Sequence, residues 1–326
     1  MQTRPLGNTG ERVSALGFGC MGLVGWYGER DDAEAKATLL AAIDGGVTHL
    51  DTAASYQVGE NERFVGAAIR GRRKDVFLAT KCGLGWQGGQ LVIDNKPESI
   101  VASCNASLER LGIDQIDLFY LHRIDRTVPV EDSVGALAGL VKAGKIRHAG
   151  LSECSAETLR KAHAVHPVAA VQMEYSVWWR GPEQAMLPIC RELGVSLVAY
   201  SPLGRGFLAG NFRTLADLPQ NDARRNQPRF LDENVQHNLA IADAVRELAE
   251  RKSATPAQIA LAWVLAQGED ILPIPGTKRR TRQAENMGAL DVTLSAADLS
   301  DLNSRVAELT VRGDRYPPAM MQALDG

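Results

Sequence analysis

Residues 49–56, HLDTAASY, begin like a buried strand and carry an aspartate, Asp51, at the point where that strand gives out. Seven further runs, short and rich in Val, Ile, Leu and aromatic residues, recur along the chain. Their near-continuous apolar character is typical of parallel strands that are buried on both faces. The eight predicted strands are SALGFG (14–19), VTHLDTA (47–53), DVFLATK (75–81), IDLFYLH (116–122), HAGLS (148–152), AAVQMEY (169–175), SLVAYS (196–201) and DILPIPG (270–276).

Amphipathic helical patterns separate these runs. Residues 31–46 open on aspartates, which are favoured N-cap residues, and close on glycines. Residues 97–112 begin with Pro and end with Gly, the asymmetry typical of a helix. Residues 130–145, 155–166 and 183–194 follow similar patterns. Eight strand–helix alternations predict an α/β fold, a closed (β/α)8 TIM barrel, with an open doubly wound sheet as the main alternative.

The two ends of the chain add to this core. Residues 4–13, RPLGNTGERV, hold an Asn-Thr-Gly turn between short segments and predict a β-hairpin that could plug the barrel floor. A helical segment is expected at the C-terminal end. Because no linker, repeat or low-complexity tract stands out, residues 1–326 are predicted to form a single domain.

Composition excludes several classes of function. The 326 residues are 45% hydrophobic and 23% charged, and Lys plus Arg (36) nearly balances Asp plus Glu (39), so no nucleic-acid partner is expected. The longest apolar segment, 259–266, is far below the ~20 residues that span a bilayer, and the N-terminus lacks the apolar region of a signal peptide. The five cysteines include no CxxC pair, which predicts neither disulfides nor a metal site and fits a cytoplasmic protein. The oligomeric state stays open.

Ionisable side chains stand at the carboxyl ends of three neighbouring predicted strands. The second strand ends in Asp51, with Tyr56 just beyond; the third ends in Lys81; the fourth ends in His122. Each alone is more often a cap, a solvated charge or a satisfied core residue. In a barrel, however, catalytic groups come from these strand ends, so the four are predicted to converge.

These four groups suit one kind of chemistry. A phenol with a pKa of about 10 is a weak acid at neutral pH, and a nearby ammonium such as Lys81 is expected to lower that pKa. Asp51 can pair with Lys81 and keep it charged, and His122 can orient the reacting oxygen. The set favours protonation of an oxygen that gains negative charge, as in carbonyl reduction by hydride from a nicotinamide.

Two glycine- or arginine-rich segments are candidates for binding a dinucleotide. GFGCMG (17–22) has the G-x-G-x-x-G spacing, but the next helical pattern begins only near Asp31, so close backbone packing is the better interpretation. IPGTKRRTRQAEN (274–286) places Lys278 and three arginines at a predicted helix start, where cations oppose the helix dipole. A bound phosphate would resolve that conflict, and a solvated basic face is the alternative.

The chain resembles the aldo-keto reductase superfamily over essentially its full length. The matching stretches are LDTAASY, FLATK, LFYLHR, GLSE, VQMEYS, VAYSPLGRG and IPGTKRRTRQAEN. The resemblance implies a (β/α)8 barrel that reduces aldehydes and ketones with NADPH, and NADH is expected to bind more weakly. The family's Asp–Tyr–Lys–His tetrad falls on Asp51, Tyr56, Lys81 and His122, with Tyr56 as proton donor.

The resemblance also implies a set of cofactor contacts. Ser152 and Gln172 would hold the nicotinamide amide, and Tyr200 would stack on its ring. Thr277, Lys278 and Arg282 would hold the 2′-phosphate of the cofactor. The remaining expected contacts are Met21, Asp51, Ser201, Leu203, Arg205, Gly206, Gly276, Glu285 and Asn286. One residue departs from the pattern, because Glu153 stands where many relatives have Asn, and a buried Glu153 would need a partner.

Aromatic residues after the first, third and sixth strands predict a substrate pocket for an apolar or aromatic carbonyl compound. They are Trp26, Tyr27, Trp86 and Trp178. The sequence does not identify the substrate. The long irregular segment 202–231 is predicted to be a mobile loop that orders over the cofactor, with a permanently ordered excursion as the alternative.

Two rival functions stay open at this point. One is a Schiff-base aldolase on the same barrel, with Lys81 as the nucleophile. The other is a regulatory subunit that binds NADPH as a redox signal, as in the potassium-channel β subunits that resemble this family. An assay of NADPH oxidation with a panel of aldehydes separates them.

Overall fold

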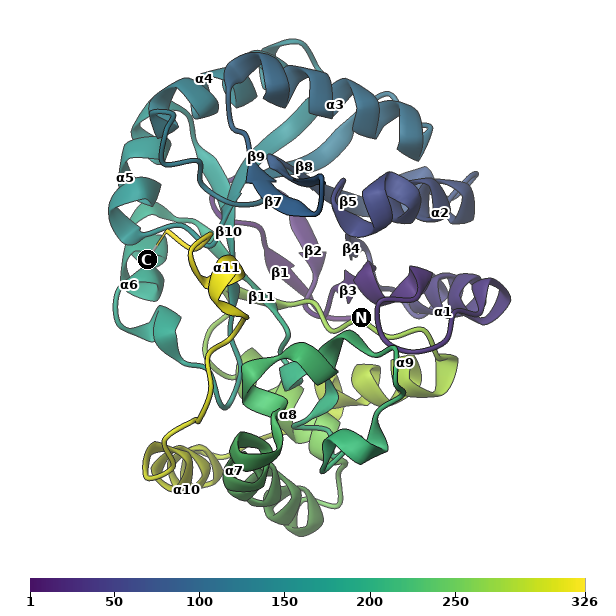
Figure 1. Ribbon diagram of the computed structural model, residues 1–326, viewed down its shortest axis with the longest axis vertical. Helices are drawn as coiled ribbons and strands as arrows, with labels where there is room; N and C mark the ends of the chain where they lie inside the picture. Colours follow the sequence, from purple (N-terminus) through teal and green to yellow (C-terminus); the bar gives the residue numbers. More distant parts are fainter. Residues whose placement is uncertain (326) are drawn as a thin grey trace.

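The computed structural model describes residues 1–325 and contains a sheet of eight parallel strands ringed by helices (Figure 1). The strands lie in the order β12-β11-β10-β9-β8-β5-β4-β3, and every neighbouring pair is parallel. They are β3 (Phe18–Gly19), β4 (His49–Asp51), β5 (Phe77–Cys82), β8 (Ile116–Leu121), β9 (Ile146–Ser152), β10 (Val168–Glu174), β11 (Ser196–Tyr200) and β12 (Ile271–Pro273). All eight fall within or overlap the predicted runs, which confirms the α/β barrel.

Backbone contacts between the first and last strands close the barrel. The amides of Gly17 and Gly19 donate to the carbonyls of Pro273 and Pro275, at 2.9 and 3.1 Å. A Cβ at Gly19 would lie 2.8 Å from the carbonyl oxygen of Ile274, and one at Gly276 would lie 2.5 Å from that of Gly19. These glycines therefore permit the close approach of two backbones at the seam.

The G-x-G-x-x-G spacing is explained by this seam. After β3 comes a single turn of 3-10 helix at Met21–Val24, and helix α1 begins only at Asp32. A dinucleotide fingerprint needs a helix to open directly after the strand. The interpretation as close backbone packing is thus the one that the structure supports.

The predicted N-terminal hairpin is present and covers the end of the barrel where the strands begin. Strands β1 (Thr3–Pro5) and β2 (Arg12–Ser14) pair in antiparallel fashion. The Asn8 amide donates to the Gly194 carbonyl, just before β11. Leu6 and Val13 are fully buried and pack with the side chains that fill the barrel interior. The first predicted strand was too long, because Ser14 belongs to this hairpin.

Helices cover the outside of the sheet (Figure 1). They are α1 (Asp32–Asp44), α2 (Glu60–Ala68), α3 (Pro97–Leu111), α4 (Val130–Lys142), α5 (Ala156–Val165), α6 (Met186–Leu193), α7 (Asp232–Arg251), α8 (Pro256–Leu265), α9 (Arg280–Met287) and α10 (Ala296–Ala307). The short helix α11 (Pro318–Met321) lies instead in the C-terminal tail, over the face of the barrel (Figure 1). Their ends follow local chemistry: Asp31 caps α1 by accepting from the Glu34 amide, and Gly112 ends α3 in the left-handed region. No helix within residues 1–325 combines the length and the apolar character needed to cross a membrane.

Three excursions leave the strand–helix pattern at the carboxyl ends of the strands. A hairpin of β6 (Leu84–Gln87) and β7 (Gln90–Ile93), which the sequence did not predict, follows β5. The segment 202–231 forms four short 3-10 turns rather than an irregular loop. The C-terminal tail after α10 returns across the face of the barrel in Figure 1, and the Asp325 amide donates to the Glu153 carbonyl.

Candidate active site

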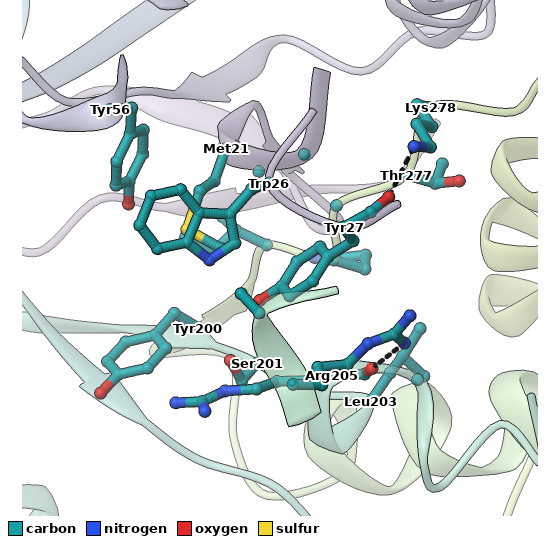
Figure 2. A pocket seen from close by; sticks show the side chains of 18 of the residues that line it. Met21, Trp26, Tyr27, Tyr56, Tyr200, Ser201, Leu203, Arg205, Thr277 and Lys278 are labelled. Carbon is teal, nitrogen blue, oxygen red and sulfur yellow. Dashed lines mark hydrogen bonds between the residues drawn. The ribbon is translucent and has the colours of Figure 1, made fainter. Parts of the chain in front are cut away.

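A pocket of about 670 Å³ opens at the carboxyl ends of the barrel strands. All fifteen residues predicted to contact the cofactor line it. Tyr56 and His122 line it too, whereas Lys81 lies behind its wall. Figure 2 shows Tyr56 and Tyr200 on one side of the pocket, Thr277 and Lys278 on the other, and Tyr27 between them.

The predicted lysine and aspartate form an ion pair inside the barrel wall. Lys81 Nζ lies 2.5 Å from Asp51 Oδ1 and donates to the Thr52 carbonyl at 2.8 Å. Gln172 Nε2 donates to the other carboxylate oxygen at 2.8 Å. Lys81 is fully buried, on β5, and Asp51 is 2% exposed, at the end of β4. Each polar atom of the pair therefore has a partner, which is the condition under which a buried ion pair is stable.

Tyr56 lies next to this pair, and its acidity differs from the prediction. The Lys81 ammonium is 5.2 Å from the centre of the Tyr56 ring. Burial raises the pKa of Tyr56 and outweighs the opposite effect of Lys81, so the net shift is upward. The predicted lowering by the ammonium is present but smaller than the cost of burying a phenolate. The phenol is consequently protonated at neutral pH.

The same balance keeps Lys81 charged. Burial acts to lower the pKa of Lys81, but Asp51 and Tyr56 together outweigh it and raise that pKa. An ammonium in this position is already coordinated by a carboxylate and a backbone carbonyl. Lys81 is thus a fixed positive charge beneath the Tyr56 ring rather than a free amine.

His122 faces Tyr56 across the pocket floor. The two rings are 5.9 Å apart and nearly perpendicular, and His122 Nδ1 is 3.2 Å from Ser55 Oγ. Burial, together with the charges of Arg123 and Lys81, pushes the pKa of His122 well below its usual value. The imidazole is therefore neutral at physiological pH and can exchange hydrogen bonds without carrying charge.

Glu153, the departure from the family pattern, has partners in the C-terminal tail. It is buried directly after β9 and forms two hydrogen bonds with Arg315, at 2.9 and 2.8 Å. The Tyr200 hydroxyl and the Glu174 amide also donate to it. Burial acts to raise the pKa of Glu153, but Arg315 outweighs burial and lowers it. Glu153 thus anchors the tail against the pocket, and Tyr316 of the tail bonds the Tyr200 hydroxyl at 2.8 Å.

The basic residues at the other end of the pocket surround the start of α9. Arg279 is the residue that precedes the helix, and its amide donates to Thr277 Oγ1 at 3.2 Å. Arg280 pairs with Glu34, and Arg282 pairs with Glu285. Within the described residues, Lys278 and Arg279 have no carboxylate partner. The end of the pocket near α9 therefore carries a positive excess.

A bridge crosses the pocket between these two ends. Lys278 Nζ donates to the carbonyl oxygens of Tyr27, at 2.5 Å, and of Glu29. The Arg224 guanidinium lies 5.1 Å from the Tyr27 ring and donates to the Arg205 carbonyl at 2.9 Å. The segment after β3 and the segment 202–231 thus meet over the middle of the pocket (Figure 2).

The predicted substrate residues are only partly brought together. Trp26, Tyr27 and Trp86 line the pocket, and Trp86 does so from the unpredicted β6–β7 hairpin. Trp178 does not line this pocket. It is buried against Phe207 and Phe230, at ring separations of 5.0 and 5.9 Å. Placing Trp178 among the substrate residues was wrong, because this tryptophan packs the base of segment 202–231.

Sequence reasoning missed several pocket residues. Arg123, Arg224, Tyr316 and Met320 line the pocket, and Arg315 holds the tail beside it. Arg123 follows His122 directly, so its position was available from the sequence. The tail residues carry no local signal, because their approach to the pocket depends on the path of some eighteen residues after α10.

A closed parallel barrel with ionisable groups gathered at its strand ends has the architecture of a barrel enzyme. The model of the aldo/keto reductase family matches residues 15–307. An NADP(+) aldo-keto reductase named yakc, from Schizosaccharomyces pombe, is 46% identical over 97% of this chain and 94% of its own length. The chain therefore belongs to the aldo/keto reductase family.

Solved structures agree with that assignment. The glycerol dehydrogenase AKR11B4 from Gluconobacter oxydans matches with a TM-score of 0.86 and 28% identity, over 97% of this chain and 98% of its own. An aldo/keto reductase from Klebsiella pneumoniae, in complex with NADP and acetate, matches with a TM-score of 0.75 and 26% identity, over 97% and 99% of the two chains.

Proposed function

We propose that this protein reduces an aldehyde or ketone to the alcohol with NADPH, and that Tyr56 donates the proton. The observation that carries the proposal is a protonated phenol on the pocket wall, with the buried Lys81–Asp51 pair 5.2 Å from its ring centre. Family membership and an NADP(+)-dependent relative that is 46% identical support the reaction class.

The pocket residues fit a phosphorylated dinucleotide. The positive excess at α9 suits a 2′-phosphate, since helix N–H groups and arginine forks both bind such groups. Arg205, near the middle of the pocket, forms no side-chain hydrogen bond or ion pair within residues 1–325 and suits a pyrophosphate. Gln172 and Ser152, both buried, line the pocket near Asp51. A bound reduced nicotinamide supplies a hydride to the carbonyl carbon.

Side chains of the protein then orient and protonate the carbonyl oxygen of the substrate. Tyr56 transfers its phenolic proton to that oxygen as negative charge develops on it. Lys81 stabilises the resulting phenolate, and Asp51 keeps Lys81 charged and oriented. Because His122 Nδ1 faces Ser55, the other ring nitrogen, Nε2, is left to hydrogen-bond the carbonyl oxygen and orient it.

An aldolase mechanism fits these side chains less well. A Schiff base needs a neutral, accessible amine. Lys81 is fully buried, paired at 2.5 Å and held in its charged form. In the regulatory alternative, NADPH binding alone is the signal. Only a measurement of turnover distinguishes this alternative from catalysis.

The test is steady-state oxidation of NADPH with a panel of aromatic and aliphatic aldehydes, with product alcohol measured in parallel. We expect one mole of alcohol for each mole of NADPH consumed. Tight NADPH binding without turnover on any carbonyl compound would instead support the regulatory alternative. Trapping of Lys81 by borohydride in the presence of a carbonyl substrate would support the aldolase.

A further inference from the structure

Four guanidinium groups and two carboxylates gather where the C-terminal tail meets the pocket. Arg315 holds Glu153 through two hydrogen bonds, at 2.9 and 2.8 Å. Arg229 holds Glu174 at 2.7 Å. These two pairs engage both carboxylates directly, and the other two guanidiniums form no ion pair with either carboxylate.

The two remaining guanidiniums belong to Arg123 and Arg205, which lie near the ring of Tyr316. Their central carbons are 6.0 and 4.8 Å from its centre, and all three residues line the main pocket. The Arg205 side chain extends toward Tyr200 in Figure 2. Since Arg205 is assigned to the cofactor, Arg123 is the charge that the proposed reaction has not yet used.

Arg123 is an unusual residue on physical grounds. It is 4% exposed, and its one side-chain hydrogen bond within residues 1–325 goes to the carbonyl of His122, at 2.7 Å. Its Nε is buried without a partner, and no Asp or Glu of the described chain forms an ion pair with it. Burial acts to lower the pKa of Arg123, but Tyr316, Tyr200 and Glu153 outweigh burial and raise that pKa, so the side chain stays charged. A buried, charged guanidinium with an N–H group that lacks a partner suits a ligand of opposite charge in the pocket that it lines.

We propose that Arg123 binds a carboxylate on the substrate, so that the preferred substrate is an aldehyde acid. The proposal rests on the reductase function proposed above and names the substrate class for it. Arg123 follows His122 directly in the chain, and both line the pocket. The planar guanidinium fork matches a carboxylate through two hydrogen bonds, which gives orientation as well as affinity.

The aromatic walls set the shape of the rest of this substrate. Trp86 and Leu91 of the β6–β7 hairpin and Trp26 after β3 line the same pocket as Arg123. They present apolar surface to a body that joins carbonyl and carboxylate. A flat aromatic or short aliphatic spacer satisfies both the Arg123 fork and the Tyr56 hydroxyl.

The first experiment compares two substrates that differ only in charge, 4-carboxybenzaldehyde and its methyl ester. In the unmodified enzyme we expect kcat/KM for the acid to exceed that for the ester by roughly ten- to a hundredfold, the worth of a charge-assisted pair. Arg123→Gln should abolish this preference. Arg123→Lys, which keeps the charge but loses the fork, should retain part of it.

The readout is the ratio of kcat/KM for the acid to kcat/KM for the ester. Loss of the hydrogen bond from Arg123 to the His122 carbonyl should affect both substrates alike and leave this ratio unchanged. Arg251→Gln, on the outer helix α7, is the matched control and should leave the ratio unchanged. If Arg123→Gln does not fold, inhibition of the unmodified enzyme still tests the proposal. Benzoate should compete with the ester substrate at much lower concentration than benzamide.

Three results would overturn the inference. Equal kcat/KM values for acid and ester in the unmodified enzyme would contradict the carboxylate subsite but not the proposed reductase function. A loss of NADPH affinity in Arg123→Gln with the acid preference retained would assign Arg123 to the cofactor. Equal inhibition by benzoate and benzamide would argue against an anion subsite. Absence of turnover on every aldehyde is a different outcome, since it defeats the proposed function itself.

Discussion

The two ends of the pocket are built in opposite ways. At the Tyr56 end, Lys81 and Asp51 come from adjacent parallel strands, are almost fully buried, and are bonded to each other and to Thr52 and Gln172. At the α9 end, the basic side chains are largely exposed, and they contact loops and surface carboxylates. One end is fixed by the barrel and the other by connecting segments.

This difference predicts which measurable quantity each end controls. Strand-borne groups have little freedom, so changes there should affect the chemical step and the stability of the core. Loop-borne cations can rearrange around a ligand, so changes there should affect cofactor affinity. This prediction would be wrong if a mutation at the Tyr56 end changed mainly cofactor affinity, or if a mutation at the α9 end changed mainly the chemical step.

The largest expected effect comes from Lys81→Met, which should abolish reduction. The substitution removes the charge proposed to stabilise the Tyr56 phenolate and leaves Asp51 buried without its ion-pair partner. Asp51→Asn should weaken reduction less, because Asp51 contacts Lys81 and is proposed to act through it rather than on the substrate. Single-turnover rates with saturating NADPH measure both. A greater loss in Asp51→Asn than in Lys81→Met would indicate direct catalysis by Asp51.

The next effect concerns the proton itself. Tyr56→Phe keeps the ring over Lys81 but removes the donor, so the rate of reduction should fall by about 10²–10⁴-fold, the range for general acid catalysis. NADPH affinity, measured by fluorescence titration, should stay nearly constant, because the residues proposed to bind the cofactor phosphates are at the other end of the pocket. A near-normal kcat in this variant would show that Tyr56 is not the proton donor.

The sequence predicted these two ends unequally. Asp51, Lys81 and His122 were predictable because their positions follow from strand periodicity, and parallel strands bring their carboxyl ends together. The helix caps and the hairpin before β3 were predictable from local chemistry. Trp178 was misplaced because a loop aromatic has no period that tells a pocket wall from a loop core.

Partners that are distant in the chain were beyond this kind of reasoning. Glu153 was recognised as a residue that needed a partner, but Arg315 lies 162 positions away. The shift in the pKa of Tyr56 was predicted with the wrong sign, because the Lys81 charge was visible in the sequence and the depth of burial was not. Burial and long-range pairing are properties of the folded chain.

The α9 end offers a test of intermediate size. If Arg282 binds the 2′-phosphate as proposed, Arg282→Ala should weaken NADPH binding by roughly ten- to a hundredfold and leave NADH binding almost unchanged. Lys278→Ala should do the same and also release the carbonyls of Tyr27 and Glu29. Titration of both cofactors into each variant gives the affinities.

Arg280→Ala is the matched control for this titration, because Arg280 pairs with Glu34 and does not line the pocket, whereas Arg282 does. It should change the affinity for either cofactor little. Equal losses of NADPH and NADH in Arg282→Ala would mean that Arg282 senses the part of the dinucleotide that the two cofactors share.

The bridge over the middle of the pocket predicts a smaller, local effect. In segment 202–231, Arg224 is held to Arg205 and to Asp222 by contacts within the loop, and among the described residues only Arg229, near the end of the segment, pairs with a barrel strand, at Glu174 of β10. We therefore expect hydrogen exchange across residues 204–231 to slow when NADPH binds. Exchange in β5 and β8 should not change. Equal protection of the loop with and without NADPH would mean that it is permanently ordered.

The smallest expected effect is an absence of pH dependence in the chemical step. The pKa of His122 is well below its usual value and that of Tyr56 is raised by burial, so neither group changes its protonation between about pH 6 and pH 8. The rate of hydride transfer to a neutral aldehyde should be flat across this range. Stability should begin to fall as the pH drops through about 6.5, because unfolded His122 has its ordinary pKa there and takes up a proton that the folded form resists. A loss of rate at acid pH should therefore be accompanied by a lower Tm. A rate that changes near pH 6.5 while Tm stays constant would contradict this prediction. It would show that His122 becomes charged during catalysis and that water reaches the barrel end of the pocket.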